Sequence, residues 1–200
     1  KQRATSDAEL GTAEQMCREA LSMKERTLGP EDPRTLTSRS NLASVARARG
    51  RVQEACALCR DSLERRERTL GRSHPQTLSS RANLAVMVRD MGDASAAEKL
   101  GSDALESRRR VLGDDHPFTL VSANNMGVIA QSRGALDEAA VLYDDAVRGA
   151  CGWLGEKHPA AALFALNRAA LWGARGLHVA AEEGARAAHG VMCDALADDH

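Results

Sequence analysis

Four histidines recur at a spacing of 42 residues, and histidine serves proteins both as a metal ligand and as an acid–base catalyst. They are His74, His116, His158 and His200. Ligands of one ion lie about 2 Å from it, whereas equivalent positions in a stack of helices are separated by about 10 Å for each helix layer. A metal ion shared along this row is therefore excluded. We expect these histidines to cap helices, a role that Asp32 takes in the first repeat.

Two cysteines, Cys56 and Cys59, have the spacing of half a zinc site or of a redox pair. The sequence has no second such pair, and small buried thiols are common. Cysteines number five, which is odd and argues against a disulfide framework. A reducing compartment, and so a cytoplasmic location, is expected. We find no phosphate-binding glycine loop, acid pair or nucleophile constellation, and expect no cofactor, no metal and no enzymatic activity.

The spacing of 42 residues extends to the residues that end and begin helices. Glycines recur at Gly29, Gly71, Gly113 and Gly155, and prolines four places later at Pro33, Pro75, Pro117 and Pro159. A glycine in a left-handed conformation ends a helix, and a proline fits the first turn of the next. Such a period is typical of a solenoid, in which each repeat buries its apolar face only against its neighbours.

Each repeat is predicted to be a helical hairpin. In the first repeat, one helix covers residues 33–49 and a second covers 52–69, with Gly50 between them. Small residues recur where the two helices must approach closely. They are Ala43, Ala85, Gly127 and Ala169 on the first helices, and Ala55, Ala97, Ala139 and Ala181 on the second.

We therefore predict a single all-α array over residues 1–200, a right-handed α-solenoid of antiparallel helix pairs with nine helices. Its expected parts are the second helix of a truncated repeat at 7–27, full repeats at 28–69, 70–111, 112–153 and 154–195, and the start of a further repeat at 196–200. Because both ends fall within a repeat, the sequence is expected to be a piece of a longer protein.

Composition excludes a disordered chain, since 43% of the residues are hydrophobic and 28% are charged. No run approaches the roughly 20 apolar residues of a membrane span, and no membrane partner is expected. The overall charge of −1 conceals an uneven distribution. Residues 28–69 carry nine basic and six acidic side chains, and 70–111 carry seven and five, whereas 112–153 carry two and six. The first two repeats are basic and the third is acidic.

Two segments carry a family resemblance. Residues 112–117 (Leu-Gly-Asp-Asp-His-Pro) and 133–140 (Arg-Gly-Ala-Leu-Asp-Glu-Ala-Ala) resemble the tetratricopeptide repeats of kinesin light chains, which also occur in the C-terminal arrays of NACHT and NB-ARC receptors. A HEAT-type solenoid of similar period is the competing fold. The glycine between the helices, followed by an acidic residue and alanine as in Gly50 with Glu54 and Ala55, favours the tetratricopeptide fold.

The resemblance implies that the first helices line a concave groove and that the asparagine eight residues after each proline points into it. These asparagines are Asn41, Asn83, Asn125 and Asn167. A carboxamide can both donate to and accept from the backbone of an extended peptide. The alternative is that these residues cap turns or bond to a neighbouring repeat.

Arg47 and Arg89 lie one turn further along the same predicted face, followed in register by Gln131 and Gly173. Arginine there offers paired donors to carboxylates, although two solvated arginines are the alternative. The predicted groove also includes Thr37, Ser44, Ser79 and Val86, and the apolar Val121, Val128, Leu163 and Leu166. We expect a partner with an acidic stretch followed by apolar residues. For the arginine-rich runs 65–68 and 108–110, glutamates such as Glu64, which faces Arg68 at helical spacing, favour a solvated outer face over a nucleic-acid site.

The resemblance implies a protein- or peptide-binding scaffold or sensor within a larger regulatory protein. The alternative is a self-assembly module, since the open end of an array exposes an apolar helix face that can stack on a second copy.

Overall fold

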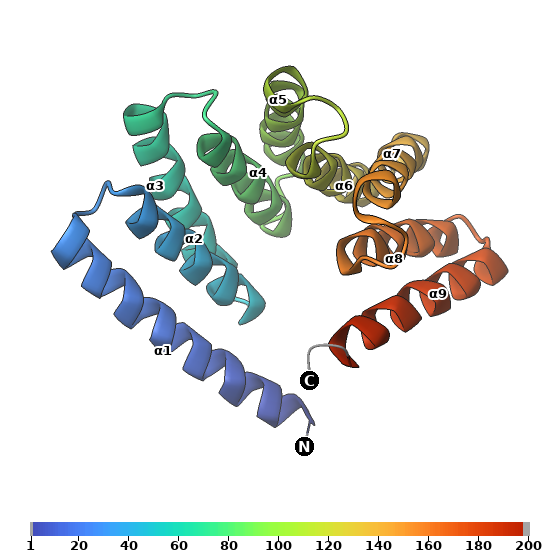
Figure 1. Ribbon diagram of the computed structural model, residues 1–200, viewed down its shortest axis with the longest axis horizontal. Coiled ribbons are helices and arrows are strands. Elements are labelled where there is room, and N and C mark those ends of the chain that lie inside the picture. Colours follow the sequence, from blue (N-terminus) through green and yellow to red (C-terminus); the bar gives the residue numbers. More distant parts are fainter. Residues whose placement is uncertain (1, 198–200) are drawn as a thin grey trace. The chain divides into compact units, whose positions relative to one another are not determined.

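The computed structural model describes residues 2–197 of the chain. The last three residues, which include His200 of the predicted further repeat, lie outside the described part. Within that part the chain is all helical (Figure 1). The helices are α1 (Gln2–Leu28), α2 (Pro33–Ala48), α3 (Val52–Leu70), α4 (Pro75–Asp90), α5 (Ala94–Leu112), α6 (Pro117–Ser132), α7 (Leu136–Leu154), α8 (Pro159–Ala174) and α9 (His178–Ala197). These bounds confirm the predicted alternation of first and second helices.

The first helices α2, α4, α6 and α8 all begin in the same way. A proline occupies the first turn, and the preceding side chain accepts a hydrogen bond from the backbone N–H two residues later. The acceptors are a carboxylate oxygen of Asp32 (2.8 Å) and Nδ1 of His74 (3.2 Å), His116 (3.2 Å) and His158 (3.1 Å). The capping role predicted for these three histidines is confirmed.

The glycines that end the second helices depart in one respect from the expected conformation. Gly71 has φ 86° and ψ 163°, and Gly155 has φ 87° and ψ 156°. Their φ is positive, as expected, but ψ is extended instead of left-handed helical. This region of the Ramachandran map is essentially inaccessible to residues other than glycine. The turn that leads to the next proline therefore depends on glycine more strictly than a left-handed cap would.

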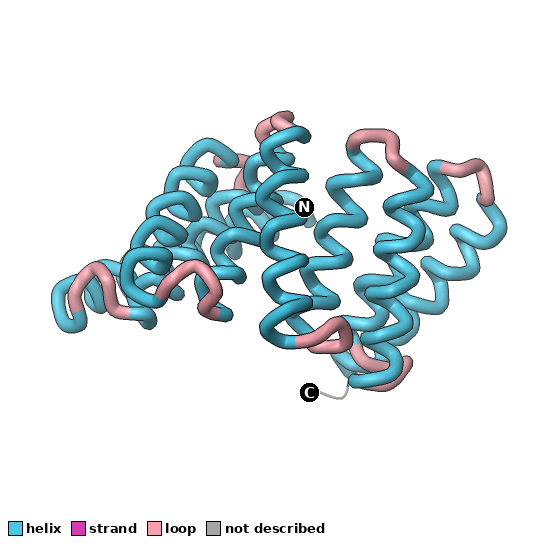
Figure 2. The backbone as a smooth tube through the Cα atoms, turned by 90° about the horizontal axis from the view of Figure 1, so that it is seen from above, coloured by secondary structure: helices cyan, strands magenta, loops and turns pink. Residues whose placement is uncertain are grey.

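The chain divides into two compact units, residues 1–100 (unit 1) and 101–200 (unit 2). In unit 1, α2 packs on α1 and α3, and α3 packs on α4. In unit 2, α7 packs on α6 and α8, and α8 packs on α9. Short loops join consecutive helices at their ends (Figure 2).

The interior of each unit is built from small and aliphatic side chains. In unit 1, Leu36, Ala43, Ala46 and Ala55 have no exposed surface. In unit 2, Ala130, Ala139, Tyr143 and Leu171 form a buried cluster. Gly127 is required beside Tyr143, because a Cβ atom at Gly127 would lie 2.7 Å from Cε1 of the ring. These contacts explain the predicted small residues at the crossing points of the helices.

Buried or half-buried cations connect a second helix to the next first helix. Lys24 donates to the Ser38 hydroxyl at 2.8 Å, and 42 residues later Arg66 donates to Ser80. Arg108 donates to the Ser122 hydroxyl and, at 2.8 Å, to the carbonyl of Phe118. Arg66 and Arg108 are 4% and 2% exposed, so the predicted solvated outer face is wrong for both. The residues next to Arg66 and Arg108 in the sequence did not indicate this burial, because the serine that accepts from each arginine lies 14 residues away on another helix.

Candidate functional site

The stripe of first-helix positions that carries the asparagines is called here the first-helix face. Helical periodicity places Thr37, Asn41 and Ser44 along it on α2. Asn41 is exposed, and Asn83 on α4 and Asn125 on α6 are half-buried. Among the described residues, these three carboxamides have no hydrogen-bond partner. Each therefore retains both a donor and an acceptor for a ligand.

The hydroxyl groups on this face in unit 1 are bonded to their own helices. Thr37 donates to the carbonyl of Pro33 at 2.8 Å, Ser44 to Ser40 at 3.2 Å, and Ser79 to Pro75 at 3.0 Å. Such bonds hold the hydroxyl hydrogen against the helix, and Thr37 also accepts from the Arg66 guanidinium of α3 at 3.1 Å. The hydroxyls of this group are consequently weaker candidates for ligand contact than the asparagines beside them.

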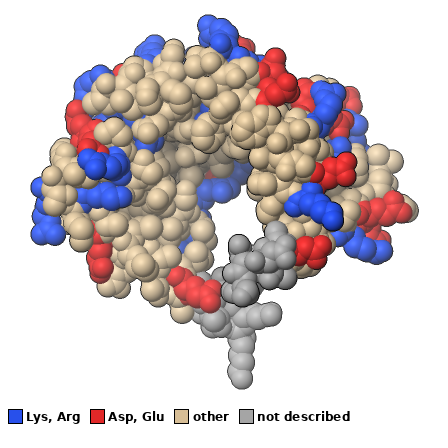
Figure 3. Space-filling model, in the orientation of Figure 1, with Lys and Arg blue, Asp and Glu red and all other residues tan. Residues whose placement is uncertain are grey.

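The two predicted groove arginines are joined by a carboxylate. Arg47 on α2 and Arg89 on α4 both pair with Asp90. Burial raises the pKa of Asp90, but the hydrogen bonds from Arg47 and then Arg89 outweigh this effect and hold the pKa below its usual range. Asp90 is thus ionised at neutral pH and offsets part of the positive charge. On the face shown in Figure 3, basic and acidic side chains commonly lie next to one another.

In unit 2 the fourth asparagine and the predicted Gln131 have partners inside the protein. Asn167 on α8 donates to Oδ1 of the buried Asn124 on α6 at 3.0 Å. Gln131 accepts from the Tyr143 hydroxyl at 3.0 Å. The alternative considered for the asparagines, a bond to a neighbouring repeat, therefore describes Asn167.

Unit 2 exposes apolar side chains along its first helices. Val121 on α6 is 38% exposed and Leu163 on α8 is 48% exposed, while Val128 and Leu166 are half-buried. Val128 packs against the cluster around Tyr143 and thus also belongs to the core.

Sequence reasoning missed Phe118, which is 51% exposed on α6. Comparison of the repeats in register could have found it, because Gln76 stands 42 residues earlier. The same comparison places the serine Ser79 at the position of Val121 and Leu163. Positions that are polar in unit 1 are thus apolar and exposed in unit 2.

Among the described residues, the cysteines and the potential metal ligands do not form a reactive site. All five cysteines are free, and burial raises the pKa of Cys59 to about 11, which keeps this thiol protonated and unreactive. Within the described part of the chain, no three metal-ligating side chains come together at one place. None of the described helices combines the length and the apolar character that a membrane crossing requires.

Paired helices in register, with carboxamides and apolar side chains on the first helix of each pair, define a helical repeat protein. Models of the tetratricopeptide repeat match residues 39–110 and 81–151, and another matches residues 5–34. The chain belongs to the tetratricopeptide repeat family, whose members are in general scaffolds for protein interaction. Comparison with curated protein sequences found no match.

Solved structures share the fold at low sequence identity. The nearly identical TPR-like repeats assigned to a kinesin light chain of Podosopora anserina are 24% identical with a TM-score of 0.66, covering 97% of this chain and 92% of that one. BtubC (BKLC) from P. vanneervenii is 23% identical with a TM-score of 0.70, covering 95% and 76%. Bacillus thuringiensis PlcR, solved with the peptide PapR7 and DNA, is 12% identical with a TM-score of 0.69, covering 98% and 70%.

Proposed function

We propose that the chain is a protein-interaction module in which the first-helix face of unit 2 binds an apolar segment of a partner protein. The exposure of Phe118, Val121 and Leu163 carries this proposal. Exposed apolar side chains at positions where another repeat of the same chain has polar ones are typical of an interaction surface. PlcR, a structural relative, was solved with a bound peptide, which supports this class of ligand.

Asn125 is proposed to fix the backbone of the bound segment. It lies one helical turn after Val121 on α6 and has no hydrogen-bond partner among the described residues. A carboxamide in this position supplies a donor and an acceptor to an extended backbone, while the neighbouring apolar side chains select the partner's side chains.

An acidic segment is proposed as the ligand of the corresponding face of unit 1. This segment would compete with Asp90 for Arg47 and Arg89, so its binding is expected to be weak in the wild type. Asp90→Asn removes the competing charge and should strengthen binding of an acidic peptide several-fold, with a steeper salt dependence. Equal binding by Asp90→Asn and wild type would contradict this assignment.

Within the cell, the module is proposed to act in the cytoplasm as a scaffold or sensor of a larger regulatory protein. The five unpaired cysteines support a reducing compartment. Light scattering over a concentration series tests the alternative of self-assembly, since growth in particle mass with concentration would favour it.

Peptide-array screening followed by calorimetry tests the apolar site. Val121→Ser with Leu163→Ser introduces the residue type of unit 1 and should weaken apolar peptides on the order of 30-fold, since each buried side chain contributes about 1 kcal/mol or more. Trp153→Thr is the matched control, because Trp153 is also exposed but lies at the end of α7. Equal losses in both variants, or none in either, would refute the proposal.

A further inference from the structure

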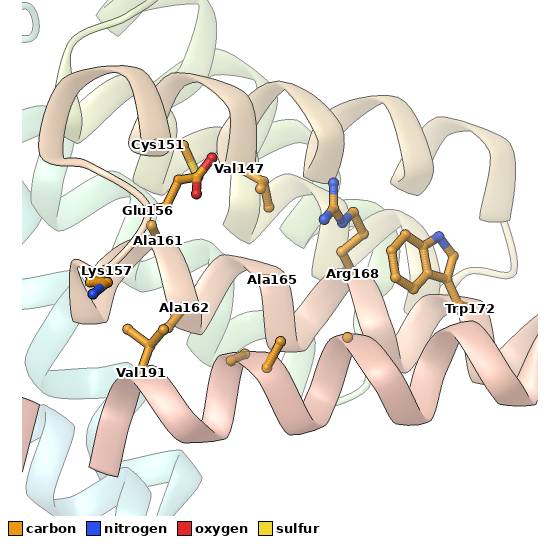
Figure 4. Close-up of a pocket in the computed structure, with 13 residues that line it drawn as sticks. Val147, Cys151, Glu156, Lys157, Ala161, Ala162, Ala165, Arg168, Trp172 and Val191 are labelled. Atoms are coloured by element: carbon orange, nitrogen blue, oxygen red, sulfur yellow. The ribbon is translucent and has the colours of Figure 1, made fainter. Parts of the chain in front are cut away.

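Unit 2 contains a half-open cavity of about 480 Å³ between α7, α8 and α9 (Figure 4). Its walls are mostly small and apolar, and include Ala161 and Ala165 on α8, Ala187 and Val191 on α9, and Val147 on α7. Ligand sites in proteins commonly have this size and an apolar lining with a few polar groups. The volume is therefore sufficient for a small molecule.

This cavity is separate from the first-helix face. Ala161, Ala165, Arg168 and Trp172 line the cavity from one side of α8, at intervals of three and four residues. Asn167 is two residues from Ala165 and so points to the opposite side of the helix, where it bonds to α6. A ligand in the cavity would leave the first-helix face of unit 2 open.

The corresponding place in the first repeat is charged. A hollow of about 440 Å³ between α1, α2 and α3 is lined by Glu25, Arg39, Asp61 and Arg65, and Arg39 pairs with both acidic residues. Three periods of 42 residues later, these four positions are occupied by Cys151, Ala165, Ala187 and Val191. The last full repeat has thus exchanged an ion-pair site for an apolar one without closing the space.

The polar groups of the cavity lie at its two ends. Arg168 and Trp172 lie at one end, and Glu156 and Lys157 at the other (Figure 4). The Arg168 guanidinium lies 4.8 Å from the centroid of the Trp172 ring, which holds it in a fixed plane.

Arg168 is not fully paired within the protein. Its Nη1 donates to Asp144 at 3.2 Å, and the Asp144 side chain is 59% exposed. Its Nε–H has no acceptor among the described residues. Such an oriented and partly paired guanidinium favours a carboxylate ligand.

We propose that this cavity binds a free medium-chain carboxylic acid, with its alkyl chain among the alanines and its carboxylate at Arg168. A cationic ligand would meet no counter-charge in the middle of the cavity, because the acidic positions of the first repeat are Cys151 and Ala187 here. An alkyl chain matches the apolar walls, and its length is limited by the volume between the two polar ends.

Calorimetry with the acids from hexanoate to dodecanoate, below their micelle concentrations, tests the proposal on the whole chain. Affinity should rise about four-fold with each added methylene until the cavity is filled. The alcohol of equal chain length should bind more weakly than the acid, and Arg168→Gln should remove that difference. A lack of saturable binding, or affinity independent of chain length, would overturn the proposal.

Two variants that fill the cavity locate the site. Ala165→Leu and Ala187→Met should abolish binding of decanoate, and Ala187 is exposed, so its replacement need not disturb folding. Ala170→Leu is the control, because Ala170 lies exposed on α8 and does not line the cavity. Decanoate bound equally by all three variants would place the ligand elsewhere.

Thiol labelling gives a readout that does not depend on affinity. Bound decanoate should slow the modification of Cys151, which lines the cavity, and leave Cys193 on α9, which does not line it, unchanged. Equal rates with and without decanoate at both cysteines would contradict the assignment. Val121→Ser with Leu163→Ser should leave decanoate binding intact, which separates this site from the proposed peptide site.

Discussion

Single residues determine where the second helices end. Gly155 has a positive φ with an extended ψ, whereas Gly152, three residues earlier, is inside α7 with open space around its Cα. A side chain is therefore strained at Gly155 but tolerated at Gly152, although the two residues lie within one helical turn of each other.

Gly155→Ala is expected to destabilise the protein by about 1 to 3 kcal/mol because alanine is strained at this backbone conformation. Gly152→Ala is the matched control and should stabilise it by about 0.5 to 1 kcal/mol through helix propensity. Urea unfolding followed by circular dichroism measures both. Equal effects of the two substitutions would show that backbone conformation at Gly155 is not limiting.

Among the carboxylates of unit 1, Glu14 has the most strongly shifted pKa. It is 2% exposed on α1 and pairs with Arg18, Arg49 and Arg51. The hydrogen bond from Arg51 is the largest effect, and with the other arginines it outweighs burial and lowers the pKa of Glu14 to about 2. The charged form is therefore the one that joins α1 to the first repeat.

Because the pKa of Glu14 is lower in the folded state than the ordinary value of 4.5, its contribution to stability is complete above pH 4.5. It should be lost progressively as the pH falls from 4.5 toward about 2. Glu14→Gln is expected to flatten the pH dependence of the melting temperature in this range. Glu9→Gln, an exposed change on the same helix, is the control, and an equal flattening by it would contradict the assignment.

At the scale of helices, the repeated contact between a buried cation and a serine connects one hairpin to the next. Arg108 on α5 and Ser122 on α6 form this contact in unit 2, and burial lowers the pKa of Arg108 to about 10. The equivalent positions 42 residues later are Ala150 and Phe164, both buried. The same helix contact is therefore polar in one repeat and apolar in the next.

Arg108→Met should cost about 1 to 3 kcal/mol, since it leaves the buried Ser122 hydroxyl without its donor. Adding Ser122→Ala should recover part of the loss, and a double-mutant cycle measures the coupling. Arg109→Met is the control, because the Arg109 side chain is 42% exposed. Strictly additive effects of the two core substitutions would show that the contact contributes nothing of its own.

At the scale of the whole molecule, the two units differ in what stabilises them. Unit 1 carries two ion-pair networks, each centred on one buried side chain. Glu14 pairs with three arginines, and Arg39 pairs with Glu25 and Asp61, whose own side chains are 37% and 39% exposed. Unit 2 has the apolar cluster around Tyr143 at its centre, and its pairs involve exposed carboxylates such as Asp137. The two units thus differ more clearly in the sign and position of their charged side chains than in their overall amino-acid composition.

Raising NaCl to 1 M shortens the screening length from about 10 Å at 0.1 M to about 3 Å. Because the partners of Glu14 and Arg39 are partly exposed, salt screens these ion pairs, and we expect amide protection against hydrogen exchange in α1–α3 to fall relative to that in α7–α9. Exchange resolved by peptide mass spectrometry compares both units in one sample, so each controls for the other. A larger loss of protection in unit 2 would contradict this account.

The sequence alone determined the helices, because their ends depend on local chemistry. Proline, the capping residue before it and a glycine at positive φ act within a few residues of chain, as Pro117, His116 and Gly113 show. The family and the repeat period followed from the same local signals. The asparagine stripe was also predictable, since residues spaced along one helix share a face.

Only the tertiary structure decided which side chains are available to a ligand. Asn167 and Asn83 are equivalent in sequence, yet Asn167 bonds to Asn124 of another helix while Asn83 has no partner among the described residues. Arg47 meets Asp90, which lies 43 residues away in the chain. Periodicity fixes the face on which a residue lies, but its partner comes from a neighbouring helix, so pairing and burial depend on packing that no local pattern contains.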